Sequence, residues 1–291
     1  MDHGTVRVGG DTLHYIESDG RDATGTDGSG DDPPLVCLHG AVIDAAHVSW
    51  GGVLDELATT LGRRVLALDQ LGYGESDRPE DAAYSTAAHV ERFGGFVDAL
   101  SLDRVVPVGL SMGGGVALGY ALDHPDRVER LVLVDSHGLG APVPGGKLTY
   151  LLSRTDVPNK AALALLSRSK GITRASLGNV VVDPGELDDA VVAEVYDLLQ
   201  RPDPGFAFRR WRRHEVTWGG YRTDYTNRLA GFEVPTLLVH GAADEVVPVS
   251  VARQAAARLP EGTLEVFEDC AHWPPRERPS VFVSRLRTWW A

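Results

Sequence analysis

The chain has 291 residues, of which 43% are hydrophobic, so it is long enough for one large core, with or without an inserted segment. Its formal net charge of −13 argues against nucleic acids and anionic membranes as partners. The sequence contains no run of about eighteen apolar residues, the length needed to span a membrane. It also contains no Cys/His spacing typical of a zinc site. We therefore expect a globular protein that binds a small molecule and needs no metal or other cofactor.

The N-terminal residues lack the basic and apolar regions of a signal peptide, so a cytoplasmic location is expected. Cys37 and Cys270 are too few for a disulfide framework and are interpreted as small core residues. Lys147, Lys160 and Lys170 are the only lysines, and aspartate outnumbers glutamate. This composition is typical of salt-loving organisms, and a GC-rich genome produces the same excess of arginine over lysine.

Alternating and β-branched runs predict a hairpin over 5–17 and strands over 35–38, 64–69, 104–108, 128–135, 235–241 and 263–267. Helical spacing predicts helices over 50–61, 86–100, 114–122, 249–258 and 279–290. Residues 19–34 are rich in Asp, Gly, Ser and Thr and are predicted to form an exposed loop. This alternation of strands and helices indicates an α/β fold whose mainly parallel sheet is covered by helices on both faces.

Residues 138–231, here called the cap segment, interrupt this alternation. They contain helical patterns over 148–153, 160–169, 185–199 and 206–218 and no convincing buried strand. An all-helical insertion between two sheet strands is expected to cover the strand ends, where ligands bind in open α/β sheets. We therefore predict a core made of residues 1–137 and 232–291 and a helical cap made of residues 138–231.

The most informative motif is Gly109-Leu110-Ser111-Met112-Gly113, between a predicted strand and a helix of small residues. A serine on such a sharp turn is strained and exposed, and glycines two residues away on either side avoid collisions with neighbouring backbone. Its side chain also lies at a helix N-terminus, where free N–H groups can stabilise a developing negative charge. Ser111 is therefore the candidate nucleophile.

A serine nucleophile needs a base, and the base needs an orienting acid. His272 follows the last predicted strand, and Asp244 follows the strand before it. Asp135 ends another strand and is an alternative acid. His39, Asp69 and His240 also follow strands and are interpreted as residues that hold their loops in place.

An oxyanion hole would use the backbone N–H of Met112 and that of Ala41, with Val42 as the second choice for the latter. Val42, Trp211, Trp218 and Trp273 are candidates for the substrate pocket. The run of arginines over 209–213 is interpreted as a solvated face, although one of them could bind an acidic substrate.

These residues resemble the α/β-hydrolase superfamily, close to its capped esterases, non-haem peroxidases and carbon–carbon bond hydrolases. The similarity spans residues 35–291 except the cap segment, and it lies in residues 38–40, 69–76, 109–114, 240–244, 272–273 and 277–279. It implies the eight-stranded α/β-hydrolase fold and a triad in the order Ser111, Asp244, His272. Haloalkane dehalogenases and epoxide hydrolases carry an aspartate as nucleophile, so the serine sets them aside.

Carbon–carbon hydrolases resemble the chain at His272-Trp273. They usually carry Asn-Ala-Met around the elbow, however, where this chain reads Leu110-Ser111-Met112. The sequence therefore predicts a serine hydrolase that cleaves carboxylic esters of small to medium size through an acyl-enzyme.

Two alternatives remain open. The first is hydrolysis of a carbon–carbon bond in a vinylogous diketone acid, for which a pocket arginine should face the substrate carboxylate. The second is a small-molecule binding protein that keeps the triad and turns over slowly. The acyl and alcohol groups and the oligomeric state are left open by the sequence.

Overall fold

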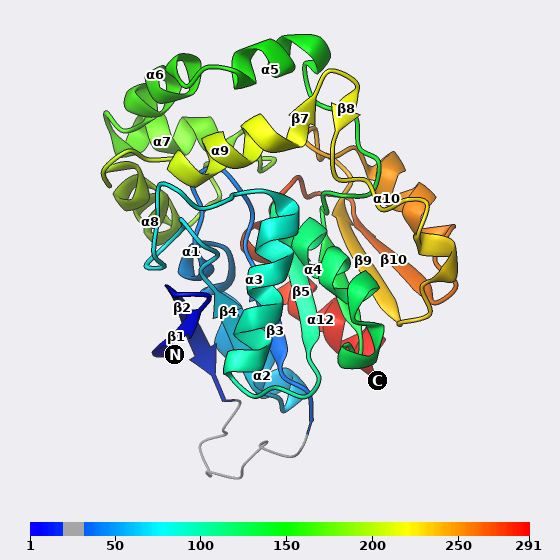
Figure 1. Ribbon diagram of the computed structural model, residues 1–291. Helices are drawn as coiled ribbons and strands as arrows, with labels where there is room; N and C mark the ends of the chain where they lie inside the picture. Colours follow the sequence, from blue (N-terminus) through cyan, green and yellow to red (C-terminus); the bar gives the residue numbers. More distant parts are fainter. Residues whose placement is uncertain (20–31) are drawn as a thin grey trace.

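The computed structural model describes residues 1–19 and 32–291 (Figure 1). Within these residues, eight strands form one sheet in the order β1-β2-β4-β3-β5-β6-β9-β10. They are β1 (Asp2–Val8), β2 (Asp11–Ser18), β3 (Leu35–Leu38), β4 (Val65–Leu68), β5 (Val106–Leu110), β6 (Leu131–Val134), β9 (Thr236–Gly241) and β10 (Gly262–Phe267). Within this sheet, only the β1–β2 and β2–β4 pairs are antiparallel. The prediction of a mainly parallel eight-stranded sheet is confirmed. The loop predicted over 19–34 falls mostly on residues 20–31, outside the described residues.

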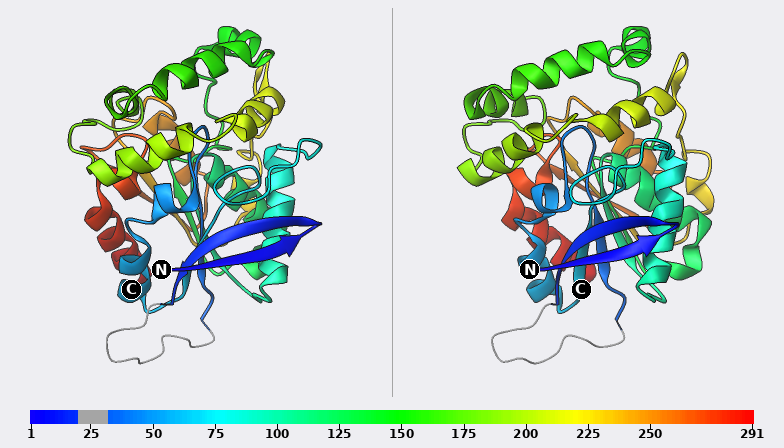
Figure 2. Two further views of the ribbon diagram at one scale, coloured as in Figure 1. Left: turned by 90° about the vertical axis from the view of Figure 1, so that its left-hand side faces the viewer. Right: turned by 60° about the vertical axis from the view of Figure 1, so that its left-hand side comes forward.

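Helices cover both faces of the sheet because successive strand residues point to opposite sides (Figure 2). Val36 and Leu38 of β3 pack with one set of helices, and Leu35 and Cys37 pack with the other. The first set is α3 (Thr86–Ala99), α4 (Met112–Asp123) and α10 (Val249–Ala256); the second includes α1 (Ala46–Trp50), α2 (Leu54–Leu61) and α12 (Pro279–Trp290). The short helix α11 (Pro274–Glu277) precedes α12, and single 3-10 turns lie at Pro125–Arg127 and Leu229–Gly231.

The single helix predicted over 50–61 is wrong. The chain forms α1 and α2 with a break at Gly51 and Gly52, which are poor helix formers.

The cap segment contains the helices α5 (Gly146–Ser153), α6 (Val157–Leu166), α7 (Lys170–Leu177), α8 (Asp189–Leu199) and α9 (Phe206–Glu215), followed by a short hairpin of β7 (Val216–Thr217) and β8 (Gly220–Tyr221). Figures 1 and 2 show these elements above the carboxyl ends of the parallel strands. The hairpin departs from the helical pattern predicted over 206–218, because α9 ends at Glu215 and the chain turns back at Trp218 and Gly219.

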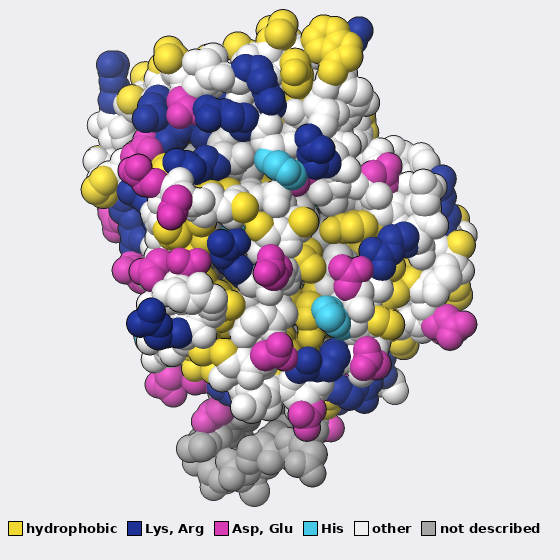
Figure 3. Space-filling model, viewed as in Figure 1, with side chains coloured by type: hydrophobic (Ala, Val, Ile, Leu, Met, Phe, Trp, Pro, Cys, Tyr) yellow, Lys and Arg dark blue, Asp and Glu magenta, His cyan; other side chains and the backbone are white. Residues whose placement is uncertain are grey.

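Charge is unevenly distributed between the cap segment and the rest of the chain. The cap segment holds 13 Lys and Arg residues against 10 Asp and Glu residues, and it holds all three lysines. On the face shown in Figure 3, many Lys and Arg side chains gather over this upper part of the molecule. The acidic excess of the chain therefore belongs to the core residues.

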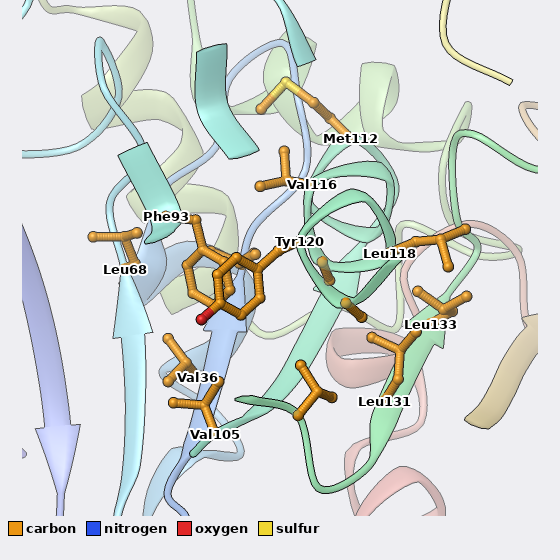
Figure 4. Close-up of a cluster of buried hydrophobic side chains, with 14 of the residues drawn as sticks. Val36, Leu68, Phe93, Val105, Met112, Val116, Leu118, Tyr120, Leu131 and Leu133 are labelled. Carbon is orange, nitrogen blue, oxygen red and sulfur yellow. The ribbon is translucent and has the colours of Figure 1, made fainter. Parts of the chain in front are cut away.

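Figure 4 shows the apolar cluster beneath the amino end of α4. Met112 lies at the top of this cluster, and Val116, Tyr120 and Phe93 extend it toward β3. The start of α4 is thereby anchored on the sheet by its own side chains. None of the described helices has the length and apolar character required to cross a bilayer.

Candidate active site

Ser111 lies on a strained turn between β5 and α4. Its φ of 51° and ψ of −116° are unfavourable for a residue with a side chain. Its N–H donates to the carbonyl oxygen of Val134, which keeps the turn attached to β6. A Cβ atom on Gly109 would lie within 3.0 Å of backbone atoms of Gly113, and one on Gly113 within 3.0 Å of the Leu38 carbonyl. The sharp turn therefore needs glycine at both positions.

Three side chains from the ends of different strands meet at this turn. Ser111 Oγ lies 2.9 Å from His272 Nε2, and His272 Nδ1 lies 2.7 Å from Asp244 Oδ2. His272 and Asp244 are buried, whereas Ser111 is partly exposed. With the carboxylate on the Nδ1 side, the ring proton sits on Nδ1, and Nε2 is free to accept the serine proton. The structure thus brings together the three residues that the sequence places in this order.

Asp244 is held as an acceptor by backbone donors as well. Its Oδ1 accepts the N–H groups of Val246 at 2.7 Å and Val247 at 3.0 Å. Burial alone would raise the pKa of Asp244, but the hydrogen bond and charge of His272 together with the Val247 N–H hold it below its usual range. The group is therefore ionised at neutral pH and can stabilise an imidazolium.

The alternative acid, Asp135, has no hydrogen bond to His272. Its Oδ1 accepts the N–H of Gly241 at 3.0 Å, and its Oδ2 has no hydrogen-bond partner among the described residues. His240 donates from Nε2 to the carbonyl oxygen of Val247 at 2.7 Å, which fits its interpretation as a residue that anchors a loop.

The loop after β3, which contains Gly40 and Ala41, passes close to the nucleophile. The Gly40 N–H donates to Asp44 Oδ2 at 2.8 Å, and a Cβ on Gly40 would lie 3.6 Å from the Cβ of Ser111. Neither Ala41 nor Met112 donates its N–H to another group in the described part of the chain. Both donors are thus available for an oxyanion.

His39 and Asp69 hold the loops beside the site. His39 donates from Nδ1 to the carbonyl of Gly40 at 2.8 Å, and its Nε2 accepts the Gln70 N–H at 3.1 Å. Asp69 accepts hydrogen bonds from the His14 ring at 2.7 Å and from backbone N–H groups. These contacts fit the structural roles inferred for His39 and Asp69 from the sequence.

A network missed by sequence reasoning connects the histidine loop to the loop after β3. Trp273 donates from Nε1 to Ser49 Oγ at 3.1 Å, and Ser49 Oγ donates to both carboxylate oxygens of Asp44 at 2.8 and 2.9 Å. Asp44 in turn holds the N–H of Gly40. Asp44 belongs to no motif, so nothing in the sequence indicates that it would support this loop.

Glu277 makes a second connection, between the histidine loop and the cap segment. Its Oε1 accepts the N–H of Ala271 at 3.1 Å, and its Oε2 accepts the N–H of Val182 at 3.2 Å. The residue before His272 is therefore fixed by a carboxylate that also binds the cap segment.

One cavity lies between the core and the cap segment, and a second lies almost entirely within the cap segment. Val42, Tyr73, Arg78 and Phe206 help to line one of about 220 Å³, and Tyr73 Oη contacts Met112 Sδ at 3.8 Å. Trp218 helps to line the other, of about 380 Å³. These cavities therefore place the predicted pocket residues Val42 and Trp218 in different parts of the molecule.

The other two predicted pocket residues line neither of these cavities. Trp211 is buried and donates from Nε1 to Thr86 Oγ1 at 3.0 Å, and Trp273 is buried against Ser49. The solvated face inferred for 209–213 is wrong at Arg209, whose guanidinium is buried and lies 2.6 Å from the Asp203 carboxylate.

Glu215, at the end of α9, joins the cap segment to the core. Its carboxylate is 1% exposed and accepts the N–H groups of Thr86 and Thr223, each at 3.1 Å, and His137 Nε2 lies 3.8 Å away. Burial alone would raise the pKa of Glu215, but the interactions with His137, Thr223 and Thr86 outweigh it and lower the pKa to about 2. This contact joins an ionised carboxylate of the cap segment to groups of the core.

Residues 33–279 match the sequence profile of the alpha/beta hydrolase fold. The chain belongs to this family. It is 32% identical over 262 residues to 2-hydroxymuconate semialdehyde hydrolase of Pseudomonas sp. (strain CF600), covering 86% of this chain and 84% of that protein. It is 28% identical over 275 residues to a proline iminopeptidase of Lactobacillus helveticus, covering 88% and 89%. The fold is similar to that of a meta-cleavage product hydrolase of Pseudomonas fluorescens IP01, with a TM-score of 0.76, 23% identity and coverage of 99% and 97%. The protein is thus an α/β hydrolase.

Proposed function

We propose that this hydrolase cleaves carboxylic esters of small to medium size, with Ser111 as nucleophile, His272 as general base and Asp244 as the orienting acid. Two consecutive hydrogen bonds support this best: Ser111 Oγ lies 2.9 Å from His272 Nε2, and His272 Nδ1 lies 2.7 Å from Asp244 Oδ2. A serine is a weak nucleophile unless an adjacent base removes its proton. Here the base is in contact and its tautomer is set.

The reaction would proceed through an acyl-enzyme. Ser111 Oγ attacks the ester carbonyl carbon while His272 Nε2 takes its proton. His272 then gives that proton to the leaving alcohol as the carbon–oxygen bond breaks. A water molecule, deprotonated by His272, attacks the acyl carbon and releases the carboxylic acid and Ser111.

The tetrahedral oxyanion would be held by the N–H groups of Ala41 and Met112. Neither N–H is used by another group among the described residues, and Met112 is the first residue of α4. Donors fixed at a helix N-terminus stabilise charge that develops in the transition state without needing to reorganise.

Cleavage of a carbon–carbon bond is the second candidate, because relatives named for that substrate class are 28 to 32% identical to this chain. Such a substrate carries a carboxylate that an arginine should meet. In the described structure, Arg78 donates to the Pro202 carbonyl and lies over the Phe206 ring, while Arg201 is paired with Glu75. Both arginines that line the 220 Å³ cavity thus already have partners within the protein.

The test has two stages. Intact-mass labelling with a fluorophosphonate, in low and in high salt, should give one adduct on the wild type and none on Ser111→Ala. Turnover of 4-nitrophenyl esters of graded chain length is then compared with turnover of 2-hydroxymuconate semialdehyde. Higher kcat/KM for esters supports the proposal, whereas higher kcat/KM for the semialdehyde replaces it with the second candidate. Labelling without turnover of either substrate would indicate a slow binding protein.

A further inference from the structure

Two buried carboxyl groups lie side by side behind the histidine. Asp135 follows β6 and Asp244 follows β9, and these strands are neighbours in the sheet. Both side chains are 0% exposed. His240 Nε2 lies 3.4 Å from Asp135 Oδ1 and 3.5 Å from Asp244 Oδ2, and a carboxylate oxygen of Asp135 lies within 4.8 Å of one of Asp244. Two ionised carboxylates this close and this deeply buried would repel each other strongly.

The imidazole between them does not neutralise this charge. His240 already donates its Nε2 proton to the carbonyl of Val247 at 2.7 Å, and burial lowers its pKa, so the ring is neutral. The trio of Asp135, His240 and Asp244 has the donor types of a metal site. However, the His240 nitrogen is used by Val247, and Asp244 Oδ2 is used by His272. A proton is therefore the species that can balance the pair.

The hydrogen bonds show which carboxyl group holds this proton. Asp244 accepts three N–H donors, from His272, Val246 and Val247, and these favour its ionised form. Among the described residues, Asp135 accepts only one, from Gly241, and its Oδ2 is buried without a partner there. A buried orphan oxygen is costly for a carboxylate, but as O–H it becomes a donor that can reach an acceptor.

We propose that Asp135 is protonated at catalytic pH and donates a hydrogen bond to Asp244, as a neutral positioning residue behind the acid. This inference rests on the proposed function, in which Asp244 orients His272. It goes beyond it by assigning a role and a protonation state to a second aspartate. The arrangement orients the Asp244 carboxylate and leaves one negative charge, instead of two, to stabilise the imidazolium.

The other ionisable groups around Asp135 are Asp244 and His240 from β9 and its loop, the Cys270 thiol from the histidine loop, and Glu277 from α11. The two carboxyl groups among them favour the same state. Burial first and the charge of Asp244 second raise the pKa of Asp135 well above its usual range, and Glu277 acts in the same direction.

The pH–rate profile of Asp135→Asn tests the protonation state. An amide is neutral and can donate the same hydrogen bond, so the acidic limb of kcat/KM should stay within about 0.3 pH units of wild type. If Asp135 were ionised, the variant would remove a negative charge beside the imidazolium, and the limb would move down by about one pH unit or more. That downward shift would overturn the proposal. A limb that shifts after dialysis of the wild type against EDTA would also overturn it, in favour of a bound cation.

Infrared difference spectra test the same point without relying on activity. At neutral pH, wild type minus Asp135→Asn should show the carbonyl band of a protonated carboxyl group, whereas loss of carboxylate bands alone would contradict the proposal. Asp135→Ser serves in the same way if the asparagine variant does not fold. Asp98→Asn, which removes an exposed carboxylate of α3, is the matched control and should change carboxylate and amide bands without any band of a protonated carboxyl group. Because the infrared result does not require a working nucleophile, it separates failure of this inference from failure of the proposed function.

Discussion

The backbone N–H of His272 donates to the carbonyl oxygen of Val180 at 2.9 Å. The general base of the proposed mechanism is therefore bound by its main chain to the cap segment and by its ring to the core residues Ser111 and Asp244. A residue fixed from both sides loses little entropy when the transition state forms. The cap segment thus supports the position of the base as well as covering the strand ends.

Glu277 offers a direct test of this support. Glutamine has one carbonyl oxygen, so Glu277→Gln leaves either the Ala271 or the Val182 N–H without its acceptor. We expect kcat to fall by about tenfold with a smaller change in KM, and the free energy of unfolding to fall by about 1–3 kcal/mol. Steady-state kinetics and urea unfolding measure both. Glu268→Gln, an exposed change in the same loop, should match wild type; unchanged kcat in Glu277→Gln would contradict this role.

Gly113→Ala tests the close approach of α4 to β3. The new Cβ would lie within 3.0 Å of the Leu38 and His39 carbonyls, which belong to backbone and cannot move aside. We expect the free energy of unfolding to fall by about 2–3 kcal/mol, although alanine is the better helix former by about 1 kcal/mol. Gly219→Ala is the control, because nothing lies within 4 Å of its Cβ position. Equal stability of the two variants in urea unfolding would show that α4 and β3 leave room for a Cβ atom at Gly113.

Ser111→Ala and Ser111→Gly separate catalysis from backbone strain. Both remove the hydroxyl, so kcat/KM should fall at least about 10³-fold in each. Glycine accepts a φ of 51° without strain, so Ser111→Gly should be more stable than Ser111→Ala by about 1 kcal/mol. Thermal unfolding of both variants checks this difference. An alanine variant as stable as the glycine variant would mean that the turn carries no strain.

The low pKa of Glu215 predicts how the free energy of unfolding depends on pH. Its pKa is about 2 in the folded chain against an ordinary value of 4.5, so its contribution to stability is complete above pH 4.5. That contribution is lost as the pH falls from about 4.5 to about 2, because the unfolded chain binds the proton first. Glu215→Gln should therefore be less stable than wild type at pH 7, with the difference narrowing toward pH 2.

Chemical denaturation at graded pH measures this difference. Glu233→Gln, an exposed change near the start of β9, should stay parallel to wild type throughout. A constant difference between Glu215→Gln and wild type at all pH values would show that Glu215 is not ionised in the folded protein.

Much of the fold follows from local pattern. The strand 35–38 and the helix 279–290 are predicted with the bounds that the structure shows, since a short buried run and a Pro-started amphipathic stretch are strong signals. The helix Lys170–Leu177 is not predicted, because its eight residues include Gly171 and few apolar residues. The β7–β8 hairpin has two residues in each strand, too few for any periodicity.

The site likewise has a part that local motifs predict and a part that they do not. Ser111, Asp244 and His272 each follow a strand within a short motif, so their meeting at one sheet edge could be anticipated from topology. The links from Trp273 to Ser49 and from Glu277 to Val182 depend on how distant segments approach in space. No local pattern reports that approach, and the same holds for the orphan oxygen of Asp135.

The confinement of Lys147, Lys160 and Lys170 to the cap segment has a practical consequence. A protease that cleaves only after lysine can cut this chain at three places, all within α5, α6 and α7. Cleavage of a helix requires that it opens locally, and the cutting rate at limiting protease reports the free energy of that opening. One digestion therefore measures how readily these three helices open separately from the sheet, without any label or substitution.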